Sequence, residues 1–384
     1  MKKLKLLLLF VPLIFIACSE DSGVPEPTVF TSAVSRHGEI SVSNGKLVNS
    51  EGISIQLCGM STHGLNYFDN FYTKNAIKAL GSSDGWRADI LRVSLYAREG
   101  GYEKNPSYYT ERVDSLVEWA SAEGLYVLID WHQLAPGDPN LDIENAKIFF
   151  EHMAMTHGSK PNILFDICNE PNSDGAYDSN WEEIPLGYTV TWNNHIKPYA
   201  ETIIPIIRKY SDNIVIVGTE QYSSRPDLVI GNELSFDNVM YAMHFYAASH
   251  GATFRNYVTQ AVNAKIPVFV TEFGTQNYSG EGDNSSSESN KWLSLLKTHK
   301  ISWCNWNYSN DWRSGAVFKT YVNESDSLLY AENDGQWWNM SSEDQQTLSR
   351  AERVEFSSVE DFYNRSNMKE AGQYIMDQLW NRTY

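Results

Sequence analysis

Residues 163–170 read Ile-Leu-Phe-Asp-Ile-Cys-Asn-Glu, an apolar run that ends in an amide and a carboxylic acid. With seven similar runs elsewhere, the full series is Ile53–Met60, Ala88–Leu95, Tyr126–His132, Ile163–Glu170, Asn213–Thr219, Asn238–Tyr246, Ile266–Gly274 and Ile301–Ser309. The runs begin about 35 residues apart, which is the size of one strand–helix unit. Most are continuously apolar and rich in Val and Ile, as parallel strands buried on both faces must be.

Amphipathic helices are predicted between these runs. Apolar residues recur at helical spacing in segments that begin at Val113, Ile196, Phe254, Trp292 and Ala371. Eight strands with intervening helices predict an α/β fold, a (β/α)8 TIM barrel.

A β-hairpin is predicted ahead of the barrel. Asn44-Gly45 stands between the short alternating runs of Ser41–Val48, which is typical of a type I′ turn. We expect this hairpin to cover the barrel floor.

Two segments do not fit the strand–helix repeat. Tyr278–Asn290 is rich in Ser, Glu, Asp and Gly and predicts a loop. Gly315–Asn367 separates the eighth run from the last helix and is far longer than ordinary connections, so it predicts an insert. Its Trp337-Trp338 pair either lines a cleft or pins the insert, and we favour the second role.

The composition excludes some classes of partner. The chain of 384 residues has 30 Lys and Arg against 48 Asp and Glu, a net charge of −18. Nucleic-acid binders are basic, and so are proteins held electrostatically on anionic membranes, so both classes are disfavoured. Aromatic residues make up 13% of the chain, which suits either a large core or a surface that stacks on sugar rings.

The amino-terminal segment predicts export. Residues 1–17 combine three early lysines with an apolar run that is too short to span a bilayer. Ala17-Cys18 ends this run and resembles the cleavage site of a bacterial lipoprotein, so we expect lipidation at Cys18 and an outer-membrane location. Ser19-Glu20-Asp21 resembles the acidic run that sends some such lipoproteins to the cell face. Ordinary secretion is the alternative. Residues 18–35 predict a flexible tether.

Three cysteines remain after Cys18: Cys58, Cys168 and Cys304. An odd number excludes a complete disulfide framework, and each lies in an apolar run, so buried free thiols are expected. No two have the spacing of zinc ligands, and no metal or cofactor is expected.

Polar residues gather at the carboxyl ends of the predicted strands, where barrels of this kind carry their function. The residues in question are His63, Arg92, Tyr96, Asp130, His132, Asn169, Glu170, His244, Tyr246, Thr271, Glu272 and Trp306. Any one of them can be a core polar group that is satisfied by its neighbours. Seven strands with this pattern at the same end favour a site.

Glu170 and Glu272 are the candidate catalytic pair. They end the fourth and seventh runs, from which two side chains can face each other across a central cleft. One protonated and one ionised carboxyl group are the equipment of glycoside hydrolysis, and proximity separates their pKa values. Arg92 and Tyr246 are donors that can orient Glu272, while Trp306 offers a flat face to a sugar ring.

The sequence resembles glycoside hydrolase family 5, and within it the bacterial endo-β-1,4-glucanases. The motifs that carry the resemblance are Gly59–Gly64, Leu91-Arg92-Val93, Asp130-Trp131-His132, Asn169-Glu170-Pro171, His244-Phe245-Tyr246 and Thr271-Glu272-Phe273-Gly274. The resemblance implies that Glu170 is the acid/base and Glu272 the nucleophile of a retaining enzyme.

The resemblance also implies roles for the surrounding residues. Arg92, His132, Asn169, His244, Tyr246 and Trp306 match the shell around the carboxyl pair, and His63 and Tyr96 match positions in the substrate cleft. Tyr67 stands where Trp is common in that cleft. Asn310-Asp311-Trp312 occupies a region where related cellulases often place a Lys. These departures leave the preferred glucan open.

Residues 36–384 are therefore expected to form a catalytic barrel, monomeric and without a cofactor, that cleaves cellulose or related β-glucans. A mannanase or mixed-linkage glucanase on the same machinery is the first alternative. A non-catalytic carbohydrate-binding protein is the second, but it would not need both Glu170 and Glu272. A metal hydrolase would want a His-x-His pair in the first run, where Ser61-Thr62-His63 has none.

Overall fold

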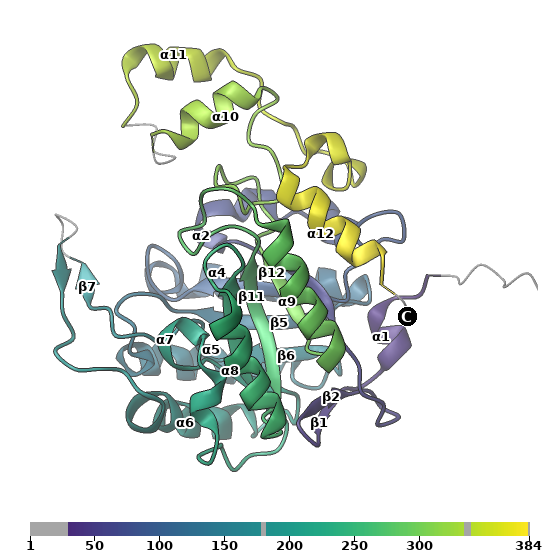
Figure 1. Ribbon diagram of the computed structural model, residues 1–384, viewed down its shortest axis with the longest axis vertical. Helices are drawn as coiled ribbons and strands as arrows, with labels where there is room; N and C mark the ends of the chain where they lie inside the picture. Colours follow the sequence, from purple (N-terminus) through teal and green to yellow (C-terminus); the bar gives the residue numbers. More distant parts are fainter. Residues whose placement is uncertain (1–29, 178–181, 334–338, 383–384) are drawn as a thin grey trace, which may run out of the picture. The chain divides into compact units, whose positions relative to one another are not determined.

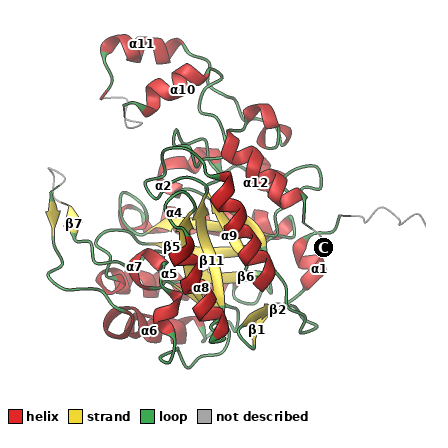
Figure 2. Ribbon diagram, viewed as in Figure 1, coloured by secondary structure: helices red, strands yellow, loops and turns green. Residues whose placement is uncertain are grey.

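Eight parallel strands form a closed barrel in the computed structural model, which describes residues 30–177, 182–333 and 339–382. Figure 2 shows the strands in yellow with red helices around them. Around the ring the order is β10, β11, β12, β3, β4, β5, β6 and β9. In chain order the barrel strands are β3 (Cys58–Ser61), β4 (Ile90–Tyr96), β5 (Tyr126–His132), β6 (Ile163–Asp166), β9 (Val215–Val217), β10 (Val239–Tyr246), β11 (Val268–Gly274) and β12 (Trp303–Trp306). Six lie within their predicted runs, and β3 and β4 end one residue beyond theirs, so the predicted (β/α)8 barrel is confirmed.

Helices follow the strands and cover the outside of the barrel (Figure 1). They are α2 (Leu65–Phe68), α3 (Lys74–Gly81), α4 (Pro106–Ala122), α5 (Ile143–His157), α6 (Lys197–Ile207), α7 (Glu220–Ser223), α8 (Ala252–Asn263), α9 (Ser286–His299) and α12 (Glu370–Trp380). The five periodic segments of the sequence correspond to α4, α6, α8, α9 and α12, and the second begins one residue before α6, at the end of η4 (Trp192–Ile196). Local chemistry sets some of the boundaries: the Asn105 side chain accepts from the Tyr108 amide, and Pro106 occupies the first turn of α4.

The side chains of each barrel strand alternate between two apolar environments. Leu91 and Val93 on β4 belong to the large core between the strands and the helices. Ile90 on the same strand, with Leu128 and Leu164 on β5 and β6, belongs to a second core inside the barrel. Side chains on a strand point to the same face every second residue, so the residue two positions after each of these three also points into the barrel. The next inward position is polar on all three strands, which places the charged groups above the apolar floor.

The predicted hairpin closes the floor. β1 (Ser41–Ser43) pairs antiparallel with β2 (Lys46–Val48), and Asn44 and Gly45 between them have φ of 50° and 75°, as a type I′ turn requires. Leu47 packs into the inner core of the barrel.

The compact unit begins at Thr31, earlier than the end of the predicted tether at residue 35. Helix α1 (Ala33–His37) starts after Ser32, whose side chain accepts from the Ser35 amide, and Ala33 is buried with the floor residues. Residues 31–35 are folded because this short helix buries apolar surface. The signal segment and Cys18 lie outside the described residues.

The predicted insert contains helices of its own. α10 (Glu324–Ala331) and α11 (Ser342–Arg350) lie between β12 and α12, at the top of Figure 1. Tyr321, Met340 and Leu348 form a small separate core there. Trp337 and Trp338 lie outside the described residues. The predicted loop Tyr278–Asn290 is shorter than expected, because α9 begins at Ser286 with Ser285 as its cap.

Two smaller findings complete the fold. Cys58, Cys168 and Cys304 are buried free thiols, as predicted, and burial raises the pKa of Cys58 to about 12. Among the described residues, none of the helices has the length and apolar character needed to cross a membrane.

Candidate active site

A cleft of about 1490 Å³ opens at the carboxyl ends of the barrel strands. Eight residues singled out from the sequence line it, namely His63, Tyr67, Tyr96, His132, Glu170, Tyr246, Glu272 and Trp306. The other three lie directly beneath. Arg92 contacts Glu272, Asn169 contacts Arg92, and His244 contacts Glu170. The barrel therefore brings all eleven residues together.

Glu272 is buried and held by two donors. Arg92 Nη1 lies 2.9 Å from Oε2, and the Tyr246 hydroxyl donates to Oε1 at 2.6 Å. Both contacts expected from the sequence are present. One positive charge and one phenolic donor stabilise the negative charge of Glu272 and fix its orientation.

Glu170 has a different environment. Its Oε1 lies 2.8 Å from His244 Nδ1, and the other ring nitrogen of His244 lies 2.7 Å from the Thr271 hydroxyl. Burial lowers the pKa of His244 to about 3, so the ring is neutral and adds no positive charge beside Glu170. Burial raises the pKa of Glu170 to about 7, although the charges of His132 and Arg92 oppose the rise. Glu170 thus holds its proton at a pH where ordinary carboxylic acids have lost theirs.

The two carboxyl groups lie close together. One oxygen of Glu170, one oxygen of Glu272 and a ring nitrogen of His244 lie within 4.8 Å of one another. Three such groups at this spacing also fit a metal ion in geometric terms. Both oxygens of Glu272 already accept from Arg92 and Tyr246, which explains the cluster as a hydrogen-bonded carboxyl pair with unequal environments.

A buried ion network supports Arg92 from below. Arg92 Nη2 lies 3.0 Å from Asp130 Oδ2 and 2.5 Å from Asn169 Oδ1, and Nε lies 3.4 Å from Asp166 Oδ2. Burial alone would lower the pKa of Arg92, but the three carboxyl groups around it raise the pKa above its usual value. The guanidinium is therefore a fixed charge that orients Glu272 and Asn169 together.

Aromatic rings form one wall of the cleft. The rings of His132 and Trp306 are nearly parallel with centroids 5.1 Å apart, and Tyr96 stacks on His132 at 4.4 Å. His63 lies 5.0 Å from Trp306. Tyr67 projects at the rim with 56% of its surface exposed. Flat rings with partly exposed faces suit the apolar faces of pyranose sugars.

Several residues of the site were not given a role from the sequence. Asp130 links Arg92 to His132, whose Nδ1 lies 2.7 Å from the same oxygen. Asp166 is a carboxyl group in an otherwise apolar strand, and that contrast was the available signal. Asp311 lies 3.8 Å from His63 Nε2, and only the fold shows this pairing.

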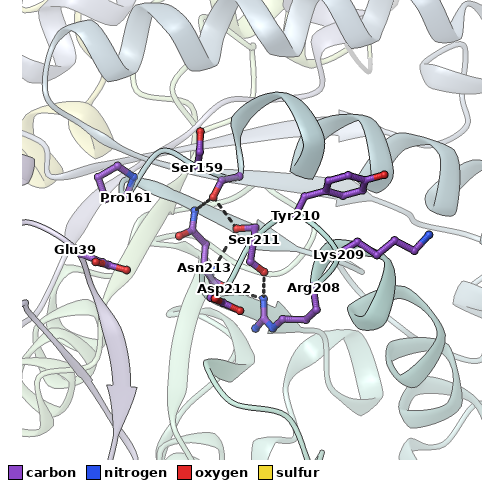
Figure 3. Close-up of a pocket in the computed structure, with 10 residues that line it drawn as sticks. Glu39, Ser159, Pro161, Arg208, Lys209, Tyr210, Ser211, Asp212 and Asn213 are labelled. Carbon is purple, nitrogen blue, oxygen red and sulfur yellow. Dashed lines mark hydrogen bonds between the residues drawn. The ribbon is translucent and has the colours of Figure 1, made fainter.

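A second hollow of about 400 Å³ lies at the opposite end of the barrel (Figure 3). Its lining includes Gly158, Ser159 and Pro161, which precede β6, and residues 208–213, which precede β9. The polar groups there are engaged with the backbone: Ser211 Oγ donates to the Gly158 carbonyl, and Arg208 Nη1 donates to the Asn213 carbonyl. Glu39 and Asp212 also line this hollow, but it lies away from the carboxyl ends of the strands where Glu170 and Glu272 meet.

Comparisons with known proteins agree with this geometry. Residues 48–311 match the family described as Cellulase (glycosyl hydrolase family 5). Endoglucanase MaCel5A of Microbulbifer sp. strain ALW1 is 38% identical over 361 residues, which cover 91% of this chain and 60% of that protein. Endoglucanase E-5 of Thermobifida fusca is 42% identical over 309 residues, which cover 78% of this chain and 62% of that protein. The chain spans about three fifths of the length of these relatives.

One similar solved structure is matched by this chain over its whole length. The catalytic domain of Thermobifida fusca endoglucanase Cel5A, as a variant in complex with cellotetraose, is similar with a TM-score of 0.73 and 36% identity. The match covers 91% of this chain and 100% of that one. The family match extends over well more than half of the chain and includes every strand of the barrel, so this protein belongs to the cellulase family of glycosyl hydrolases, family 5.

Proposed function

We propose that this protein is a retaining endo-β-1,4-glucanase. The observation that carries the proposal is the approach of Glu170 and Glu272, with one oxygen of each within 4.8 Å of the other in the cleft. Retaining glycosidases hold their carboxyl groups about 5–5.5 Å apart, whereas inverting enzymes need roughly 6.5–9.5 Å to admit a water molecule.

In the first step the Glu272 carboxylate attacks the anomeric carbon, and the bond to the leaving oxygen breaks. Glu170, protonated because burial raises its pKa to about 7, gives its proton to that oxygen. In the second step Glu170 takes a proton from water, the water oxygen attacks the same carbon, and Glu272 is released. Two inversions give net retention.

The neighbours of the pair support these steps. Arg92 and Tyr246 keep Glu272 charged and aimed. Neutral His244 forms a hydrogen bond with Glu170 and adds no positive charge that would lower the pKa of Glu170. Asn169 is fixed by Arg92 through its amide oxygen, and its amide nitrogen lies 3.4 Å from His132 Nε2.

A polymeric β-1,4-glucan is the substrate that the cleft supports. Its volume of about 1490 Å³ exceeds the roughly 300–1,000 Å³ of ordinary small-molecule sites, so several sugar residues fit. The similar Thermobifida fusca domain was solved with cellotetraose, a chain of this kind. Reducing-end assays on carboxymethylcellulose, β-mannan, xyloglucan and barley glucan test the preference, and a higher kcat/KM on mannan than on carboxymethylcellulose would refute it.

The roles of the two carboxyl groups are tested with Glu170→Ala and Glu272→Ala. Both variants should lose turnover of polymeric glucan. On an aryl cellobioside with a good leaving group, Glu170→Ala should keep a fast first step, because that departure needs little protonation. Azide should then rescue Glu170→Ala with a β-glycosyl azide product and Glu272→Ala with an α-glycosyl azide product.

Glu99→Gln is the matched control, since Glu99 lines the same cleft but stands apart from the pair. It should keep its activity within about threefold. NMR of the first wild-type product gives a separate readout. An initial α-anomer would mean direct attack by water and would refute the nucleophile role of Glu272.

We further propose that the protein is exported and lipidated at Cys18, because an apolar run and Ala17 precede this cysteine. Wild-type protein from a bacterial host should partition into the detergent phase of a Triton X-114 extraction, and Cys18→Ser should not. Equal partitioning of the two proteins would place the anchor elsewhere.

A further inference from the structure

The insert between β12 and α12 reaches the active-site cleft. Thr320, Tyr330 and Arg353 of this insert line the same cavity as Glu170 and Glu272. Trp312, which precedes the insert, lines it as well, with the Arg313 guanidinium 4.8 Å from the centre of its ring. A connection far longer than usual has thus added surface to the cleft.

The insert holds these side chains on a small scaffold of its own. Tyr321 pairs with Arg353 in an antiparallel bridge, and the Val322 amide donates to the Glu352 carbonyl at 3.1 Å. Tyr321 is buried among Met340 and Leu348. The Thr320 hydroxyl donates to the Asn310 carbonyl at 2.7 Å, which ties the scaffold to the segment that follows β12.

Tyr330 and Arg353 have the chemistry of a sugar site. The ring of Tyr330 is half-buried and packs at 6.0 Å against Tyr321, so one part is fixed while another part stays exposed. The Arg353 guanidinium lies 5.5 Å from the centre of the Tyr321 ring, and its Nη2 donates to the Tyr321 hydroxyl at 3.5 Å. A flat ring beside an anchored, exposed guanidinium offers a stacking face and several hydroxyl donors.

The ring order gives the side of the cleft on which this surface lies. β12, which leads into the insert, stands four strands away from β6, which leads to Glu170, so the two are opposite in the eight-stranded ring. The general acid protonates the leaving oxygen and therefore lies toward the leaving part of the glucan. The insert meets the other part, the glycone, beyond the position of His63, which contacts Asp311.

We propose that Tyr330 and Arg353 form a distal glycone subsite that binds a glucosyl residue at least two positions away from the one attacked by Glu272. This subsite rests on the proposed endoglucanase function and specifies it. It makes the enzyme prefer long chains, because only a chain that extends past His63 can reach the insert.

The test compares a long and a short substrate. Tyr330→Ala and Arg353→Ala should each lower kcat/KM on cellohexaose roughly five- to tenfold, mainly through KM. On an aryl cellobioside, whose two sugars are too few to reach the insert, the same variants should stay within twofold of wild type. Tyr330→Phe keeps the ring and should keep most of the activity on cellohexaose.

Leu328→Ala and Arg350→Ala are the matched controls. Leu328 is exposed on the same helix as Tyr330, and Arg350 ends α11, but neither lines the cleft. Both should leave the two substrates unaffected. Undiminished cellohexaose turnover by Tyr330→Ala and Arg353→Ala would overturn the subsite, and so would equal losses on both substrates. A wild-type protein inactive on both substrates would instead refute the endoglucanase function.

The side of the cleft is tested by the products. With cellohexaose labelled by 18O at the reducing end, Tyr330→Ala should release fewer fragments of three or more sugars from the non-reducing side. A change confined to the fragments from the reducing side would contradict the glycone position.

Discussion

The two ends of the barrel share the same strands but contain opposite chemistry. At the floor, the inward residues Leu128, Leu164 and Ala242 pack in an apolar core. One strand period later, Asp130, Asp166 and His244 occupy the next inward positions and are also buried. The strand backbone therefore fixes where a side chain points, and the residue type alone decides whether that end of the barrel packs or reacts.

The difference also separates the energetics of the two ends. Apolar contacts at the floor need no specific partner, whereas each buried charge at the cleft end requires one. Arg92 has three carboxyl groups and an amide around it, and Glu272 has two donors. Substitutions at the floor should thus change stability, and substitutions at the cleft end should change activity.

The largest expected effect is that of Glu272→Ala at the cleft end. Loss of the nucleophile should reduce kcat on polymeric glucan by at least about 10³-fold. The denaturant midpoint should fall little, because Arg92 keeps Asp130 and Asn169 as partners. Steady-state reducing-end assays measure kcat, and urea unfolding measures the denaturant midpoint. A large loss of stability without rescue by azide would show that Glu272 is structural.

Leu128→Ala makes the opposite change at the floor. Removal of a fully buried leucine should lower the free energy of unfolding by about 2–5 kcal/mol. Activity per folded molecule should stay within about twofold, because Leu128 belongs to the apolar core of the floor and does not line the cleft. Urea unfolding measures the loss of stability. The kcat/KM of the variant, determined 20 °C below its thermal midpoint of unfolding, measures the activity of the folded protein. A loss of activity larger than the loss of folded protein would mean that the two ends are coupled.

The pH profile sharpens the contrast between the two carboxyl groups. Glu170 acts as an acid, and its pKa is raised to about 7 mainly by burial, so its active protonated form predominates below that pH. The kcat/KM should therefore begin to fall near pH 7 and then decrease about tenfold per pH unit. The apparent pKa of this basic limb belongs to the coupled pair of carboxyl groups. Glu170→Gln should lose this limb on an activated aryl cellobioside. An unchanged limb in that variant would assign it to another group.

The smallest effect separates two aspartates beneath the site. Asp130 touches both Arg92 and His132, so Asp130→Asn should lower kcat/KM roughly tenfold or more. Burial, followed by the nearby charge of Asp130, raises the pKa of Asp166 well above its usual value, although Arg92 opposes this. Asp166 contacts Arg92 only at 3.4 Å, and its raised pKa favours the neutral form that an amide resembles, so Asp166→Asn should cost less than about threefold. The reverse order of the two losses would contradict the assigned charges.

Much of this protein was determined by the sequence itself. Eight buried runs, the Asn44-Gly45 turn and the helical periodicities predict the barrel, its hairpin floor and its helices, because backbone period and burial are local properties. The polar ends of the runs indicate the cleft for the same reason. Glu170 and Glu272 stand out because a carboxylic acid at the end of an apolar strand needs an explanation.

Only the tertiary structure decided how these residues meet. The separation of Glu170 and Glu272, which distinguishes retention from inversion, depends on the closure and order of the ring. The partners of Arg92 come from the ends of three other strands, β5, β6 and β11, and no spacing along the chain predicts them. The insert likewise lines the cleft on the side of β12, which lies opposite β6, a relation that exists only after the barrel has closed. Chain patterns encode direction and burial, whereas distances across the barrel arise from packing, which couples residues far apart in the sequence.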